Sequence, residues 1–144
     1  MSPALIVALP IIAFAAAFHL HWALGGRTGL AVSLPQRPDG TPVMAHRIGW
    51  WRPAAGIIAF GLVILGGLAV AVAQNATAPL PVGIARAALA VTGTGFILRA
   101  IVPTPWTGFF KSIRGTRWAR YDSGLYSPLF LTLGASLIAI ALGY

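Results

Sequence analysis

Carboxylate and thiol side chains, which supply many catalytic bases, nucleophiles and metal ligands, are scarce in this sequence. Asp39 and Asp122 are its two acids, and it has neither Glu nor Cys. Chemistry that needs two carboxylates in one site therefore has almost nothing to work with. Without Cys, the chain forms no disulfide and offers no thiolate nucleophile or Cys-ligated metal. The inventory argues against carboxylate-pair and thiol-based catalysis.

Three histidines, His19, His21 and His46, are further candidates for ligands or acid–base groups. His19 and His21 are two residues apart, about 200° around a helix, so they cannot face the same ligand. A haem held by two histidines would need a second ligand from elsewhere, and a zinc site needs three or four ligands. We therefore predict no metal site. We expect His19, His21 and Trp22 to form a belt at the membrane interface.

Asp122 is expected to form an ion pair, because it follows Arg120 closely and precedes an apolar run. Arg99 is a second candidate partner, since it lies near the same boundary at the end of the preceding apolar run. We predict a structural salt bridge among Arg99, Arg120 and Asp122 that ties the intervening loop to the third apolar run. The functional alternative is that Asp122 accepts a proton or orients a substrate.

The segment from Gly108 to Pro128 alternates basic and aromatic residues. Its basic residues recur every three positions, and Trp118 and other aromatic residues lie between them. Such a segment can lie at the membrane surface, with its rings at headgroup depth and its charges on lipid phosphates. We predict that anionic lipid or a protein partner binds Lys111, Arg114, Arg117, Trp118 and Arg120. The simpler alternative is an anchor without lipid preference, and nucleic acid suits a membrane-bound segment badly.

The composition indicates that these residues are positioned by membrane-spanning helices. Hydrophobic residues make up 58% of the 144 residues and charged residues 8%, and the mean hydropathy is +0.83. A spanning helix needs roughly 20 mostly apolar residues. Four runs qualify, and we predict one all-α domain, an integral membrane four-helix bundle, with spans at about 4–24, 54–73, 81–102 and 127–144.

The basic residues predict how the bundle is oriented. The loops 25–52 and 103–126 each contain four Lys or Arg residues, whereas the N-terminus and the connection 74–80 contain none. Basic loops stay on the cytoplasmic side of a membrane. We therefore expect both basic loops in the cytoplasm and both termini on the other side.

Two stretches, Phe18–Pro35 and Gly108–Leu129, resemble a family of small bacterial membrane proteins named domain of unknown function 3995. The second stretch carries the pattern GFFK-x-x-R-x-T-x-x-A-R-x-D followed by YSP. The resemblance runs from end to end and implies four helices in a bacterial inner membrane; it supplies no activity. The matching positions are His19, Trp22, Gly26, Pro35, Gly108, Phe109, Phe110, Lys111, Arg114, Thr116, Ala119, Arg120, Asp122, Tyr126, Ser127 and Pro128.

Together, these features predict a multi-pass membrane protein without catalytic machinery. It would be an accessory or assembly subunit, or a small homo-oligomer, with a basic cytoplasmic surface that contacts anionic lipid or a partner. The alternative is a membrane enzyme or redox component that binds a lipid-soluble substrate or cofactor at His19 and Arg99. Arg99 suits this role because an ionisable group inside a membrane span is a candidate functional residue.

Overall fold

The computed structural model describes residues 2–43 and 50–144, which form helices joined by loops. Four helical segments are long and apolar enough to cross a membrane. The described residues contain no strand, so the predicted all-α fold is confirmed. The long helices are α1 (Pro3–Ala23), α2 (Trp51–Ala73), α3 (Val82–Ile101) and α5 (Ser127–Leu142). The short elements are the 3₁₀ turn η1 (Leu30–Val32), α4 (Arg117–Tyr121) and the π-helical turn η3 (Asp122–Tyr126).

The fourth membrane-length helix begins ten residues earlier than the apolar run that predicts it. Elements α4, η3 and α5 follow one another without a break, so one helical segment extends from Arg117 to Leu142. Thr116 sets its start, because the Thr116 hydroxyl accepts a hydrogen bond from the Ala119 N–H at 3.1 Å. A side-chain oxygen at this position satisfies a donor that the first helical turn leaves free. The segment that carries Arg117 and Arg120 is therefore helical.

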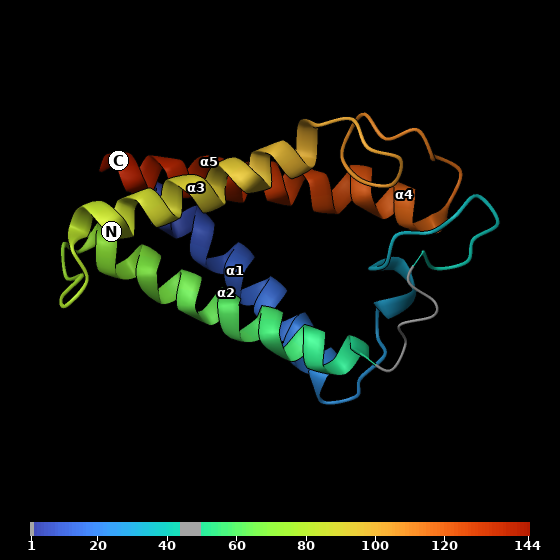
Figure 1. Ribbon diagram of the computed structural model, residues 1–144, viewed down its shortest axis with the longest axis horizontal. Helices are drawn as coiled ribbons and strands as arrows, with labels where there is room; N and C mark the ends of the chain where they lie inside the picture. Colours follow the sequence, from blue (N-terminus) through green and yellow to red (C-terminus); the bar gives the residue numbers. More distant parts are fainter. Residues whose placement is uncertain (1, 44–49) are drawn as a thin grey trace.

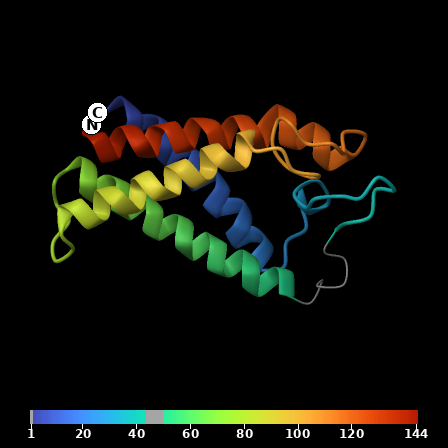
Figure 2. The same cartoon turned by 45° about the horizontal axis from the view of Figure 1, so that its top comes forward.

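The long helices pack mainly as two pairs, α1 with α2 and α3 with α5, and α1 also contacts α5 (Figure 1). Both termini lie at the same end of the molecule, and the loop residues 24–43 and 102–116 lie at the other (Figures 1 and 2). The main hydrophobic core joins the pairs at the end that carries the termini. Its buried residues are Leu5, Ala8, Ile12, Ala69, Val72, Ala85, Leu89, Leu133, Leu137, Ile140 and Ala141.

Two glycines allow α3 and α5 to cross closely. A Cβ atom at Gly93 would lie 2.6 Å from the Gly134 carbonyl oxygen, and one at Gly134 would lie 2.6 Å from the Gly93 carbonyl oxygen. Close approach of helix backbones through small residues is a common way to pack helices in lipid.

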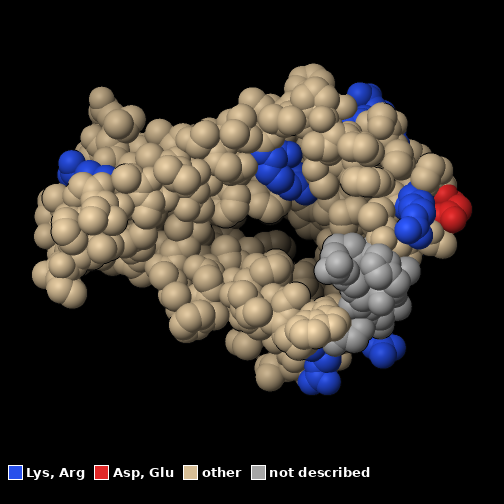
Figure 3. Space-filling view, in the orientation of Figure 1, with Lys and Arg blue, Asp and Glu red and all other residues tan. Residues whose placement is uncertain are grey.

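Away from this crossing the two helix pairs diverge. Figure 3 shows that the molecule is hollowed between them on this face, and several basic side chains gather at the loop end of the same face. The loop residues Phe109 and Lys111 are partly and fully buried, respectively, so the connection between α3 and α4 is folded against the helices. The fold thus places a structured loop beside an open space.

Candidate functional site: the Asp122 cluster and the α4 cleft

The loop between α3 and α4 folds back onto the end of α3 through Gly108. Gly108 has a φ of +86°, and the next residue, Phe109, donates its N–H to the Ala100 carbonyl oxygen at 2.8 Å. A Cβ atom at Gly108 would lie 2.8 Å from that same oxygen. Glycine is required here both by the backbone conformation and by the close contact. The turn directs the Gly108 N–H toward Asp122.

Asp122 is completely buried and accepts hydrogen bonds from four groups. Its Oδ2 atom accepts from the Gly108 N–H at 2.8 Å, from Lys111 Nζ at 3.0 Å and from the Ser127 hydroxyl at 3.3 Å. Its Oδ1 atom accepts from the Arg99 guanidinium at 2.5 Å. A carboxylate offers about four lone-pair positions. With these donors in place, Asp122 joins the loop, α3 and α5 and has little capacity left to act as a base.

Lys111 lies inside the protein, with only 1% of its side chain exposed. Its ammonium group donates to the Gly108 carbonyl oxygen at 2.8 Å, to Asp122 at 3.0 Å and to the Ser123 hydroxyl at 2.6 Å. These acceptors match the three N–H donors of an ammonium group. This placement corrects the expectation that Lys111 contacts lipid headgroups, because the chain encloses its charge.

Arg99 extends from α3 to the start of α5 and contacts Asp122 as the sequence suggests. It also donates to the Ser127 hydroxyl at 3.0 Å, and its guanidinium carbon lies 4.4 Å from the centre of the Phe130 ring. An arginine over an aromatic face gains a cation–π attraction. Arg120, the other expected partner of Asp122, is exposed; in the described part of the chain the ion pairs of Asp122 are with Arg99 and Lys111.

Trp118 links the two basic loops. Its backbone N–H donates to the Gln36 side-chain oxygen at 3.1 Å, and its indole N–H donates to the Trp106 carbonyl oxygen at 2.7 Å. Its ring stacks on Tyr126 at a centroid distance of 5.3 Å. Only 6% of Trp118 is exposed, so the expectation that this ring sits among lipid headgroups is also corrected. Through these contacts Trp118 attaches α4 to Gln36 of the first basic loop and to Trp106 of the loop after α3.

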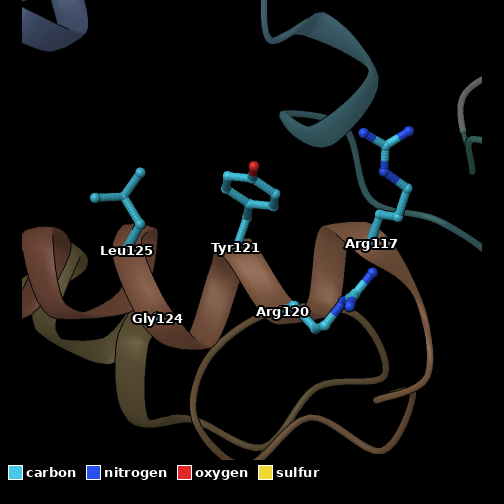
Figure 4. A pocket seen from close by; sticks show the side chains of 5 residues that line it. All are labelled: Arg117, Arg120, Tyr121, Gly124 and Leu125. Carbon is cyan, nitrogen blue, oxygen red and sulfur yellow. The ribbon is translucent and has the colours of Figure 1, made fainter.

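Arg114, Arg117 and Arg120 remain on the surface. The Arg114 Nε donates to the Lys111 carbonyl oxygen at 3.1 Å. Arg117 and Arg120 line an open cleft of about 510 Å³ together with Tyr121, Gly124 and Leu125. Figure 4 shows the two arginines at one end of this stretch and Leu125 at the other, with Tyr121 and Leu125 pointing to the side on which η1 lies. We refer to this feature as the α4 cleft.

The histidines lie apart from this cluster. The His19 ring is 2.8 Å from the Ala15 carbonyl oxygen and packs edge-on against Trp22, at a centroid distance of 5.0 Å. The exposed His21 ring covers Gly26, and together with Ala17, Phe18 and Thr28 it lines a second, smaller pocket of about 250 Å³. His46 is outside the described residues. In residues 2–43 and 50–144 no group of three possible metal ligands occurs, and His19 and Arg99 form their hydrogen bonds with different partners.

Comparison with known proteins identifies the family of this chain. Residues 12–137 match the family described as Protein of unknown function (DUF3995). The chain belongs to the DUF3995 family. The residues that match this family include α3, the loop that holds Gly108 and Lys111, the buried carboxylate and the α4 cleft. Searches of curated proteins and of solved structures gave no match.

Several residues of the cluster are not found by sequence reasoning. The repeat of basic residues at every third position groups Lys111 with the surface arginines, but the chain becomes helical only at Arg117. One signal does distinguish it: Lys111 is the single lysine among ten basic residues. A compact ammonium group with three donors suits a small buried site that the planar arginine side chain does not. Gly108 and Ser127 give no comparable signal of their roles.

Proposed function

We propose that this protein is a non-catalytic, multi-pass protein of the bacterial inner membrane. In this proposal it acts as an accessory subunit or a small homo-oligomer, and its arginine surface, formed by Arg114, Arg117 and Arg120, associates with anionic lipids. The observation that carries the proposal is the division of charges at the loop end. The acid near the arginines is buried and engaged by two other cations, whereas the three arginines are exposed.

The saturation of Asp122 favours binding over catalysis. A general base needs a free lone pair within reach of its substrate, and a nucleophilic carboxylate needs an exposed oxygen. Asp122 has four donors and no exposed surface. The other acid, Asp39, accepts two hydrogen bonds from Thr41 in the first basic loop. Both acids of the chain therefore have local structural roles.

The proposal places the arginine surface on the cytoplasmic side. Both basic loops lie at one end of the molecule and both termini at the other (Figure 1). Basic loops favour the cytoplasmic side, where the leaflet carries anionic lipids. A reporter enzyme that works only outside the cytoplasm, fused after Tyr144, is expected to be active. Activity only of a cytoplasmic reporter at this position would contradict the orientation.

The lipid preference is tested by changing all three arginines to Gln. The protein is reconstituted in nanodiscs that contain equal parts of phosphatidylglycerol and phosphatidylcholine, and the lipid that remains after stripping with detergent is measured by mass spectrometry. Each exposed arginine near an anionic surface is worth about 1 kcal/mol. The triple variant should therefore lose its preference for phosphatidylglycerol by up to about 100-fold at low salt.

The matched control removes arginines from the other basic loop. Arg27 and Arg37 are exposed, and changing both to Gln removes charge without altering α4. We expect this double variant to keep most of the preference for phosphatidylglycerol. An equal loss per charge in the two variants would mean that total charge, and not the surface formed by Arg114, Arg117 and Arg120, sets the preference.

A further inference from the structure

We infer that the α4 cleft binds one anionic phospholipid molecule, with its phosphate between Arg117 and Arg120 and its chains beside Tyr121 and Leu125. This inference rests on the proposed function and makes it specific. A basic surface alone attracts a changing layer of anionic lipids, whereas the inferred site holds one lipid in a defined place. Three features support the site: the order of residues along the cleft, the lack of an ion pair to Arg117 or Arg120 in residues 2–43 and 50–144, and the open space at Gly124.

The order of residues along the cleft matches the order of groups in a phospholipid. Arg117 and Arg120 form the end nearest the loops, Tyr121 follows, and Leu125 lies one helical turn further toward the apolar helix α5 (Figure 4). A phospholipid likewise passes from a charged phosphate through the glycerol ester region to its acyl chains. Tyrosine favours the depth at which polar and apolar zones meet.

Arg117 and Arg120 are exposed, and neither takes part in an ion pair in the part of the chain that the structure describes. In residues 2–43 and 50–144, the ion pairs are those of Asp122 with Arg99 and Lys111. Arg117 and Arg120 are three residues apart on one helical segment, so their side chains are neighbours. A phosphate accepts hydrogen bonds from guanidinium groups in a planar, two-pronged geometry. Two adjacent arginines beside an apolar wall therefore complement the head of an anionic lipid.

Gly124 leaves room for the ligand between the charged and the apolar ends. A Cβ atom built at this position meets no other atom within 4 Å, although Gly124 lies inside the continuous helical segment. The π-helical turn η3 contains this residue, and such turns are frequent at functional sites. Leu125 and α5 belong to a helix long enough to cross a membrane. A soluble phosphate would use only the arginines, so the apolar part of the cleft favours a lipid as the source of the phosphate.

The site is tested by blocking the space without changing any charge. The purified protein in mild detergent is titrated with phosphatidylglycerol, phosphatidylcholine or inorganic phosphate, and the bound mass is read by native mass spectrometry. We expect the unchanged protein to retain one phosphatidylglycerol at least tenfold more tightly than phosphatidylcholine. Gly124→Phe should reduce this affinity at least tenfold, whereas the control Gly124→Ala should leave it within twofold.

The charged end of the site has its own matched pair of variants. Arg117→Gln combined with Arg120→Gln should reduce phosphatidylglycerol affinity at least tenfold. Arg27→Gln combined with Arg37→Gln removes the same charge from the other loop and should change the affinity less than threefold. If Gly124→Phe melts well below the unchanged protein, Leu125→Gln replaces it, since this change removes the apolar contact without adding bulk. We expect it to weaken phosphatidylglycerol binding severalfold.

Three results would overturn the inference. Unchanged phosphatidylglycerol binding by a folded Gly124→Phe and by Leu125→Gln would show that the cleft is not the site. If the arginine variants still lost lipid preference in that case, the proposed function would stand without the cleft. Equal retention of inorganic phosphate would identify a site for a soluble anion. A dimer that Gly124→Phe dissociates would identify a second copy of this chain as the occupant.

Discussion

Gly93 and Gly134 face each other where α3 crosses α5, so closely that a Cβ atom on either would lie 2.6 Å from the carbonyl oxygen of the other. The contact is between backbones, and no side chain can move aside to relieve it. This crossing holds the two helices that present Arg99 and Ser127 to Asp122. The distance between α3 and α5 at the Asp122 cluster therefore depends on the absence of side chains at Gly93 and Gly134.

Gly93→Ala should destabilise the protein by about 1–3 kcal/mol, the usual cost of adding atoms to a packed contact. Gly95→Ala on the same helix is the control, because a Cβ atom there meets nothing within 4 Å. Alanine is a better helix former than glycine by about 1 kcal/mol, so the control should be neutral or stabilising. Thermal unfolding in the same detergent compares the two variants. A lower melting temperature for Gly95→Ala than for Gly93→Ala would contradict this account.

Asp122→Asn should be strongly destabilising, because it leaves the Lys111 ammonium and the Arg99 guanidinium without a counter-charge. Removing one partner of a buried ion pair costs about 3–5 kcal/mol. The chain offers a matched control in Asp39→Asn, since Asp39 is its other acid and is exposed. Urea or thermal unfolding in detergent should separate the two variants clearly. Similar stabilities would mean that the cluster contributes little to the fold.

Gly108→Ala should release the loop between α3 and α4. The φ of +86° is costly for alanine, and the added methyl group would meet the Ala100 carbonyl oxygen at 2.8 Å. We expect a loss of about 2 kcal/mol or more. Gly115→Ala, where a Cβ atom meets nothing within 4 Å, is the control.

The state of this loop can be measured by cleavage at one site. Lys111 is the single lysine of the chain and is 1% exposed. A protease specific for lysine should therefore leave the unchanged protein and Gly115→Ala intact for hours. It should cut Gly108→Ala and Asp122→Asn after residue 111. Resistance of both variants would show that the loop keeps its place without these contacts.

The pKa of Asp39 is lowered by the Thr41 hydroxyl, which donates to the carboxylate at 2.7 Å, and then by the Thr41 N–H at 2.9 Å. Thr41→Val removes the hydroxyl, so the pKa of Asp39 should rise toward its ordinary value of 3.8. A lowered pKa in the folded state contributes stability above the ordinary value, and this contribution is lost as the pH falls through the folded pKa. A carboxyl NMR titration between pH 2 and about pH 6 measures both values. An unchanged pKa would assign the shift to the backbone N–H and Arg37.

The sequence predicts the helices well because their physical cause is local. Each membrane-length helix contains an apolar run, and a lipid environment requires hydrogen-bonded backbone within it. The contact between Arg99 and Asp122 is also foreseeable, since an acid near a membrane boundary needs a cation and few other acids compete for the arginines.

The remaining features depend on long-range contacts that residue spacing does not encode. Gln36 meets Trp118 across 82 residues. Gly93 meets Gly134 although neither glycine has a small residue four positions away in its own helix. The hydroxyls of Thr94 and Ser136 donate to the Ala90 and Thr132 carbonyl oxygens of their own helices, so they do not join neighbouring helices. Lys111 is buried because a left-handed turn at Gly108 redirects the chain just before it.

The order of residues around Asp122 has a consequence for how the protein is made. Arg99, Gly108 and Lys111 all leave the ribosome before Asp122, and Ser127 leaves it after. Until the carboxylate is synthesised, Lys111 and Arg99 lack their counter-charge, and burying the Lys111 ammonium alone would be costly. The nascent chain can therefore insert α1, α2 and α3 while the second basic loop remains outside the membrane. The last helical segment to be synthesised supplies Asp122 and Ser127, and the second basic loop can then fold around the carboxylate.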